Sequence, residues 1–195
     1  MQPFAKTAVA SRALLSLGAN LSILGRHPKD TIAKALDLLA ERTGTQPTAS
    51  RFYRTPAFPP GAGPDFVNAA AELPWSGTAQ DLLSLLHEIE ASLGRTRKTR
   101  WEARIMDMDL IALGDQVLPD VMTQRRWADL PTERAAIETP DQVILPHPRL
   151  QERGFVLVPL AEIAPNWRHP LTGESVAEML AARPASERAE IWPIP

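Results

Sequence analysis

The chain has 195 residues, of which 44% are hydrophobic and 23% are charged, and its formal net charge at pH 7 is -2. These values are typical of one globular domain, and so small a charge gives no general attraction to nucleic acid or another polyanion. The absence of cysteine excludes disulfides, thiolate metal sites and a cysteine nucleophile, and no apolar run approaches the roughly 18 residues of a membrane-spanning helix. We expect a single cytoplasmic domain over 1–195 with no nucleic-acid or membrane partner.

The first half of the chain predicts alternating strands and helices. Short apolar runs and period-two alternation indicate strands, whereas apolar residues at helical spacing between an N-cap and a glycine indicate helices. In chain order we expect a strand at 13–17, a helix from Asp30 to Gly44, strands at 48–53 and 65–73, and a helix from Thr78 to Gly94. The proline-rich segment 55–64 is predicted to be a loop, because proline cannot donate to a sheet or continue a helix.

The second half has one clear strand and several weaker elements. We expect a strand at 105–113, a weakly patterned segment from 114 to 142, a short strand at 155–160 that runs into a helical turn, and a helix at 175–182. The order β-α-β-β-α-β is the split pattern of the ferredoxin-like fold. The prediction is therefore an α+β domain, with an antiparallel sheet, helices packed on one face of it, and additional C-terminal elements.

Two carboxylates mark the strand predicted at 105–113. Asp107 and Asp109 point to the same face, because side chains two apart on a strand do so, and Met108 turns toward the core. Adjacent carboxylates repel each other and raise each other's pKa unless a cation lies between them. Oxygen ligands of this kind suit Mg²⁺ in a site that leaves room for water and phosphate. The alternative is an ordinary solvated strand face.

A basic segment precedes these carboxylates directly. Its cations are Arg95, Arg97, Lys98, Arg100 and Arg104. Taken alone, such a run is usually a solvated loop, but carboxylates and cations together are the equipment of phosphoryl transfer. The chain contains neither G-x-x-x-x-G-K-[ST] nor G-x-G-x-x-G, so a phosphate clamp has to be built from side chains and metal.

Other candidate residues are a histidine, two phenylalanines and an amide. His147 lies between two prolines in a rigid loop close to Arg153, where it is either structural or a donor to a phosphate oxygen. Phe66 and Phe155 are core residues by default. Asn68 shares a strand face with Phe66, and its amide can form the paired bonds that a flat heterocycle requires.

Five motifs in order carry a family resemblance. They are Tyr53-Arg54-Thr55-Pro56; Pro64-Asp65-Phe66-Val67-Asn68-Ala69; Gly94-Arg95-Thr96-Arg97 through Arg100-Trp101; Arg104 with Asp107-Met108-Asp109; and Leu145-Pro146-His147-Pro148-Arg149 with Arg153-Gly154-Phe155. From about Leu14 to Pro165 the chain resembles the 6-hydroxymethyl-7,8-dihydropterin pyrophosphokinases. Any one motif is weak evidence, but their order and spacing together are highly specific.

The resemblance implies a ferredoxin-like enzyme of folate synthesis that transfers pyrophosphate from ATP to the hydroxymethyl group of a dihydropterin and releases AMP. It implies that Asp107 and Asp109 bind two Mg²⁺ ions and act in catalysis with Arg95, Arg97 and Arg104. The implied pterin site is Thr55, Pro56, Phe58, Phe66, Asn68, Trp101 and Phe155, with Trp101 closing over the pterin in a mobile loop. The implied ATP site is His87, Glu90, Arg95, Arg97, Lys98, Trp101, Arg104, Leu110, Ile144, His147 and Arg153. We expect a monomer with these small molecules as its partners.

The chain departs from the family pattern in two places. Glu102-Ala103 replaces the usual Gly-Pro after Arg-Trp, which adds a negative charge and removes a rigid turn beside Trp101. The segment from about 115 to 142 is longer than the family normally carries at that point. We therefore expect one domain with a long insert.

Two other functions fit parts of the pattern. An RNA-binding module can use the same βαββαβ layout, but the chain has one tyrosine, no RNP1-like string and a slightly negative charge. A steep loss of RNA affinity with salt would indicate such a module. A metal-dependent phosphohydrolase or nucleotidyltransferase could also use Asp107 and Asp109. The nucleotide product separates these possibilities, because pyrophosphoryl transfer releases AMP.

Overall fold

The computed structural model describes residues 10–22, 25–57, 63–94, 105–135 and 137–195. The strands are β1 (Ser11–Ala19), β2 (Thr48–Ala49), β3 (Phe52–Thr55), β4 (Phe66–Trp75), β5 (Asp107–Leu113) and β6 (Trp192–Ile194). The helices are α1 (Pro28–Thr43), α2 (Ala79–Ser92), α3 (Val121–Ala128), α4 (Thr132–Ala135), α5 (Gly154–Ile163), α6 (Val176–Ala182) and α7 (Ala185–Ala189), with a 3-10 turn at Leu150–Glu152. None of the helices in this described part has the length and apolar character needed to span a membrane.

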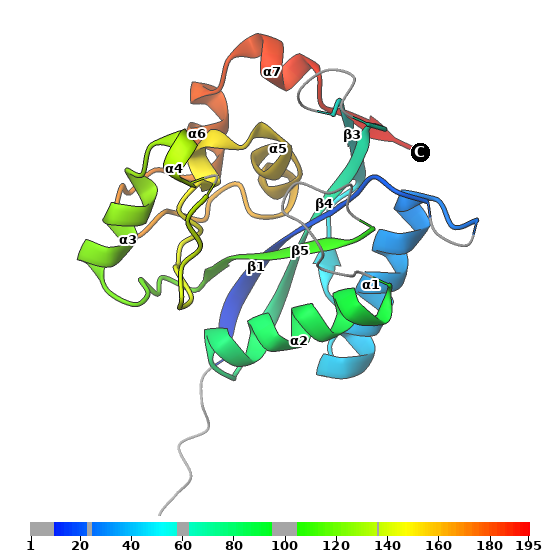
Figure 1. The fold of residues 1–195 in the computed structure, drawn as a ribbon, viewed down its shortest axis with the longest axis horizontal. Helices are drawn as coiled ribbons and strands as arrows, with labels where there is room; N and C mark the ends of the chain where they lie inside the picture. The colour runs from blue at the N-terminus through cyan, green and yellow to red at the C-terminus, as the bar shows by residue number, and fades with distance from the viewer. Residues whose placement is uncertain (1–9, 23–24, 58–62, 95–104, 136) are drawn as a thin grey trace, which may run out of the picture.

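A six-stranded sheet forms the centre of the described structure (Figure 1). Its strand order is β5-β1-β4-β3-β6, and β2 pairs with β4 beyond the end of β3. Every pairing is antiparallel. The long β1 and β4 lie in the middle, so the ends of the shorter strands decide how much of each sheet face remains open.

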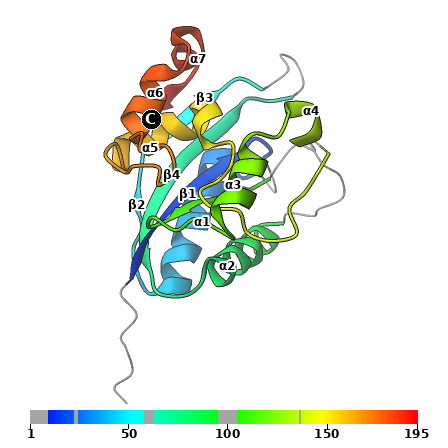
Figure 2. The same cartoon turned by 90° about the vertical axis from the view of Figure 1, so that its left-hand side faces the viewer.

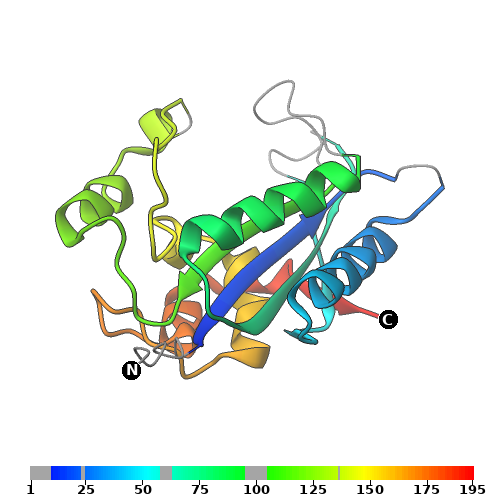
Figure 3. The same ribbon diagram turned by 90° about the horizontal axis from the view of Figure 1, so that it is seen from below.

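One face of the sheet is covered by α1 and α2, which cross it side by side (Figure 3). The alternation predicted for β4 is confirmed, since Val67 and its neighbours at every second position lie in the core under these helices. The helix start predicted at Thr78 is confirmed: Thr78 is the N-cap of α2 and forms a capping box with Asp81. The N-cap predicted for α1 is wrong by three residues: it is His27 rather than Asp30, because the His27 ring accepts a hydrogen bond from the amide of Lys29.

The other face is covered by α5, on which α6 packs, and this corrects two predictions. Residues 155–160 form the middle of a helix rather than a strand, and helices therefore lie on both faces of the sheet (Figure 2). Val156, Leu157 and Leu160 are buried in a second core with Leu14 and Ala70 of the sheet. A run that is apolar at nearly every position has no period, so the sequence could not distinguish a buried helix from a strand.

The insert contains two helices, α3 and α4, and returns to the body of the domain at residue 145. Leu118 and Leu145 exchange backbone hydrogen bonds of 2.9 and 3.1 Å. The buried side chain of Gln124 donates to the carbonyl of Pro146 at 3.1 Å. The side chain of Arg149 reaches the Leu130 carbonyl at 3.4 Å. The insert is thus attached to the His147 loop on both sides of the histidine.

Candidate active site

Several of the predicted site residues lie on the sheet face that packs against α5. Gly18 of β1 pairs with Asn68 of β4 on one side and with Asp107 of β5 on the other. Opposed residues of antiparallel strands point to the same face, so the amide and the carboxylate lie in one row across the sheet. Two strand spacings separate them, about 10 Å between backbones.

The carboxylate pair occupies the edge of this face. Asp107 and Asp109 are both partly exposed, whereas Met106 and Met108 are buried beneath α2, as the strand alternation predicts. Asp109 lies opposite Ser16 of β1, and its carboxylate is 3.6 Å from Nη1 of Arg153. The two carboxylates therefore share an open face that a cationic ligand can reach.

The His147 loop runs alongside this strand. The amide of His147 donates to the carbonyl of Ile111 in β5 at 2.8 Å. Its ring nitrogen Nδ1 accepts a hydrogen bond from the amide of Arg149 at 3.1 Å, which leaves Nε2 as the protonated nitrogen of the neutral ring. Burial of the ring, with the positive charge of Arg153, lowers the pKa of His147 to about 3. The imidazole is therefore neutral at pH 7 and presents an N–H donor.

Arg153 and Phe155 flank the first residue of α5. The guanidinium of Arg153 lies over the Phe155 ring, 5.8 Å from its centroid. Phe155 is 38% exposed, which is unusual for a large apolar side chain in a chain with two well-packed cores. An exposed ring beside a cation is suited to contact with a planar ligand.

The amide of Asn68 is buried and held in one orientation. Its Nδ2 donates to Oγ1 of Thr55 at 2.6 Å, and Thr55 is itself buried. Phe66 is partly exposed at the start of β4 and faces Thr55 across the strand pair, and Pro56, at the end of β3, is exposed. These predicted pterin residues thus lie together at one end of the sheet.

The remaining predicted ATP residues lie in different places, on α2, in the core and next to the His147 loop. His87 lies on α2, and the buried carboxylate of Glu90, one turn further along, accepts a hydrogen bond from the amide of Met108 at 2.7 Å. Glu90 therefore holds the strand between the two aspartates. Ile144 is buried next to the His147 loop, but the side chain of Leu110 packs in the core under α2 rather than toward the carboxylates.

Part of the predicted site lies outside the described residues. The residues concerned are Phe58, Arg95, Arg97, Lys98, Trp101 and Arg104. Their proposed roles remain predictions from the sequence.

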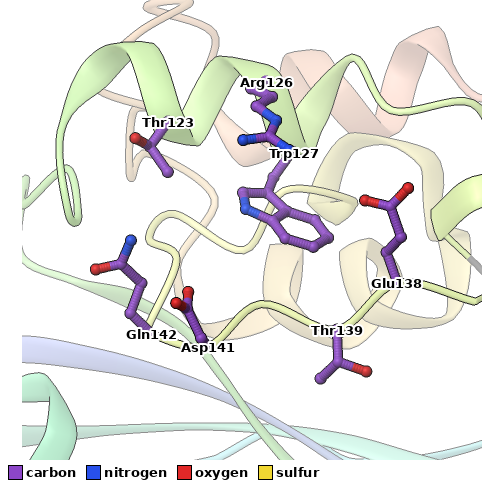
Figure 4. A pocket seen from close by; sticks show the side chains of 7 residues that line it. All are labelled: Thr123, Arg126, Trp127, Glu138, Thr139, Asp141 and Gln142. Atoms are coloured by element: carbon purple, nitrogen blue, oxygen red, sulfur yellow. The ribbon is translucent and has the colours of Figure 1, made fainter.

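Of two hollows in the described structure, one borders a predicted pterin residue and the other is lined by none of the predicted residues. One of about 630 Å³ borders Phe66 and Asp65 and reaches Ile194 of β6. The other, of about 670 Å³, lies within the insert, between α3 and the segment after α4 (Figure 4). It is lined by Thr123, Arg126, Trp127, Glu138, Thr139, Asp141 and Gln142, none of which belongs to the predicted sets.

Gly18 is a residue of this face that the sequence reasoning missed. A Cβ atom at this position would lie 3.1 Å from Oδ1 of Asn68, closer than an ordinary contact. The absence of a side chain therefore keeps the floor open between Asn68 and Asp107. The signal lay in the Gly-Ala-Asn ending of the first strand, but it could be interpreted only once the cross-strand register was known.

Comparisons with known proteins identify the family of the chain. A family model described as 7,8-dihydro-6-hydroxymethylpterin-pyrophosphokinase matches residues 14–165. The chain is 33% identical over 183 residues to the 2-amino-4-hydroxy-6-hydroxymethyldihydropteridine pyrophosphokinase of Synechocystis sp.. This match covers 93% of this chain and 80% of that protein. It is 35% identical over 174 residues to the protein of the same name from Pseudomonas aeruginosa, with 89% and 92% covered.

Solved structures support the same fold. An HPPK-DHPS protein crystallised in complex with substrates matches with a TM-score of 0.65 at 12% identity, and a Plasmodium falciparum HPPK-DHPS triple mutant with a TM-score of 0.61 at 13%. These matches cover 95% and 91% of this chain but 46% and 45% of the solved chains, so the chain spans about half their length. The match over 14–165 and the two relatives covered to 80% and 92% of their length establish that the chain belongs to the 7,8-dihydro-6-hydroxymethylpterin-pyrophosphokinase family.

Proposed function

We propose that the open end of the sheet face is where this pyrophosphokinase of folate biosynthesis transfers the terminal pyrophosphoryl group of ATP to the hydroxymethyl group of the dihydropterin. The observation that carries the proposal is the row formed by Asp107, Gly18 and Asn68. It places a carboxylate suited to a metal-phosphate site and an amide suited to a heterocycle on one surface, at a separation that a pterin and a polyphosphate can span.

The carboxylate pair fits Mg²⁺. Two partly exposed carboxylates leave coordination positions for water and phosphate oxygens, which Mg²⁺ prefers to a protein-only cage. In keeping with this, the described ranges contain no group of three or more His, Cys, Asp or Glu side chains that could enclose a metal. When bound, Mg²⁺ neutralises and orients the phosphate oxygens of ATP. We take Asp107 and Asp109 as its protein ligands, with two ions expected from the family resemblance.

The neighbouring donors complete the phosphate site. Neutral His147 offers Nε2–H without competing for a proton at physiological pH, and its loop is fixed to β5 by the bond to Ile111. Arg153 adds a guanidinium within reach of Asp109. Charge-assisted donors placed before the reaction stabilise the negative charge that develops on the transferred group.

The pterin site is built from an amide and an aromatic ring. Asn68 retains a free carbonyl lone pair and one N–H after its bond to Thr55, enough to pair with the edge of an aminopyrimidinone ring. Phe155 supplies a stacking face on the side of α5, and Phe66 lies near the start of the same strand as Asn68. The hydroxymethyl group of a ring held in this way points along the row toward the carboxylates.

The whole chain is proposed to act as one domain. The strand order β5-β1-β4-β3 supports a ferredoxin-like βαββαβ arrangement, to which the insert, α5 to α7 and β6 are added. A monomeric, cytoplasmic enzyme with ATP and the pterin as its partners fits the near-neutral charge and the absence of cysteine.

The reaction is tested by identifying both products. Purified protein is incubated with ATP, MgCl₂ and 6-hydroxymethyl-7,8-dihydropterin, and the nucleotide and pterin are analysed by mass spectrometry. The proposal requires AMP and a pterin that has gained two phosphates, in equal amounts. ADP with a singly phosphorylated pterin, or phosphate release that does not need the pterin, would identify a different kinase or a phosphohydrolase.

A further inference from the structure

The C-terminal helix α7 lies outside the segment that matches the family model, yet it contacts the start of α5. The family match ends at residue 165, and α7 begins at Ala185. The carboxylate of Glu187 in α7 accepts a hydrogen bond from the amide of Gly154 at 2.9 Å, across 33 residues of sequence. Figure 1 shows α7 next to α5 on the side of the sheet away from α1 and α2.

This contact caps a helix that has no local cap. The N-cap residue of α5 is Arg153, whose side chain makes no capping hydrogen bond. The first amides of a helix lack partners within the helix and carry a partial positive charge, so a carboxylate stabilises them. Glu187 therefore provides from a distant part of the chain what Ser, Thr or Asp usually provides locally.

Both partners are built for this contact. A Cβ atom at residue 154 would lie 2.6 Å from Oε1 of Glu187, so a side chain at this position would push the carboxylate away from the amide. The other carboxylate oxygen of Glu187 accepts hydrogen bonds from Nε and Nη2 of Arg183, at 2.9 and 2.7 Å. The side chains of this ion pair are only 32% and 26% exposed. Arg183 thus holds the carboxylate in the orientation in which it accepts the hydrogen bond from Gly154.

The capped amide lies between two residues of the candidate site. Arg153 and Phe155 precede and follow Gly154, and their side chains face the carboxylate of Asp109 and each other. A shift of the first turn of α5 would move both. We propose that Glu187 is a positioning residue, which fixes the start of α5 and so aims Arg153 and Phe155; its effect on catalysis rests on the proposed function, but its effect on the helix start does not.

Three variants test the proposal. Glu187→Ala removes the acceptor, Glu187→Gln keeps a neutral acceptor of the same shape, and Glu190→Ala removes an exposed carboxylate from the end of the same helix. Each is compared with the wild type by hydrogen exchange at the amides of residues 154–157 and by kcat/KM for the pterin at saturating ATP. Both measurements are made at a temperature well below the melting temperature of every variant.

In Glu187→Ala the amide hydrogen of Gly154 should exchange with solvent at least about tenfold faster, because its partly buried hydrogen bond to a charged group is lost. It should also lower kcat/KM for the pterin about tenfold, as expected when positioning groups shift by part of an ångström. Glu187→Gln should recover most of both quantities, and Glu190→Ala should match the wild type.

Two results would overturn the proposal. Unchanged exchange at Gly154 in Glu187→Ala would mean that the carboxylate does not cap α5. Faster exchange with an unchanged kcat/KM would mean that the cap serves stability alone. A wild type that forms no pterin diphosphate would instead refute the proposed reaction, and the exchange data would still decide whether Glu187 holds the helix.

Discussion

Replacing Gly18 by alanine should separate activity from stability. The new methyl group would lie 3.1 Å from Oδ1 of Asn68, so the amide has to move by a few tenths of an ångström. Asn68 has little freedom to do so, because it is 3% exposed and its Nδ2 is held by Thr55 at 2.6 Å. The methyl group would also occupy the floor between Asn68 and Asp107.

The expected loss follows from this geometry. If the amide is displaced, the pterin loses part of one paired hydrogen bond in a buried site, a cost of about 1–1.5 kcal/mol, or roughly a tenfold rise in KM for the pterin. The fold should lose little, since alanine in the interior of a strand is more favourable than glycine by roughly 0.5–1 kcal/mol, and this gain offsets the cost of displacing the confined amide. Gly18→Ala should therefore bind the pterin more weakly while its melting temperature stays constant or rises.

The assay combines steady-state kinetics with thermal unfolding. KM for the pterin is measured at saturating ATP, KM for ATP at saturating pterin, and the melting temperature in parallel. Thr55→Ala is the matched second variant, because it removes the partner of Asn68 without adding volume to the floor, and it should also raise KM for the pterin. An unchanged pterin KM in a stable Gly18→Ala protein would refute the view that this row binds the pterin.

Three further predictions concern the aromatic ring, the insert and a buried histidine. Phe155→Ala should weaken pterin binding by roughly 1–3 kcal/mol, by analogy with the stacking of bases on aromatic side chains, and leave binding of a non-hydrolysable ATP analogue almost unchanged; equal losses in calorimetric titrations of both ligands would mark Phe155 as structural. Gln124→Ala should lower the free energy of unfolding by about 1–3 kcal/mol, because the buried carbonyl of Pro146 loses its donor. The control variant Gln142→Ala changes an exposed side chain and should leave the free energy of unfolding unchanged. Equal urea midpoints for the two variants would contradict the anchoring role of the insert. Burial lowers the pKa of His169, against the opposing effect of Glu174, so the unfolded chain binds a proton that the folded chain does not. The stability that this neutral ring provides is present above its ordinary pKa of 6.5 and is lost as the pH falls below that value. His169→Gln should therefore reduce the fall in the free energy of unfolding between pH 7.5 and pH 5.5. An unchanged slope in this variant would contradict the assigned role of His169.

Local signals in the sequence predicted the central part of the fold well. The capping box at Thr78 and Asp81 specified the start of α2, and the alternation in β4 specified which of its side chains face α1 and α2. The same period-two argument placed Asp107 and Asp109 on one face opposite the core methionines. These features depend on residues a few positions apart, so a single sequence contains them.

Features that depend on distant residues could not be read in this way. The segment 155–160 is rich in valine and leucine, and it forms a helix because a second core surrounds it and Glu187 caps its start. The insert is weakly patterned in apolar residues, although its sequence contains a local helix-start signal: Asp120 is the N-cap of α3 and accepts a hydrogen bond from the amide of Thr123, three residues further on. The role of Gly18 required the register of three strands.

The most direct measurement of the central claim is the turnover of Asp107→Asn beside Asp115→Asn at saturating Mg²⁺ and ATP. The first change removes a charge from the open sheet face, and the second removes one from an exposed turn just after β5. The row of groups described above predicts that Asp107→Asn keeps the wild-type melting temperature to within a few degrees and loses about 10²-fold or more in pterin diphosphate formation, because charge stabilisation at phosphate is lost. Asp115→Asn should retain full turnover. Near-normal turnover of Asp107→Asn would contradict the assignment of this face as the catalytic centre.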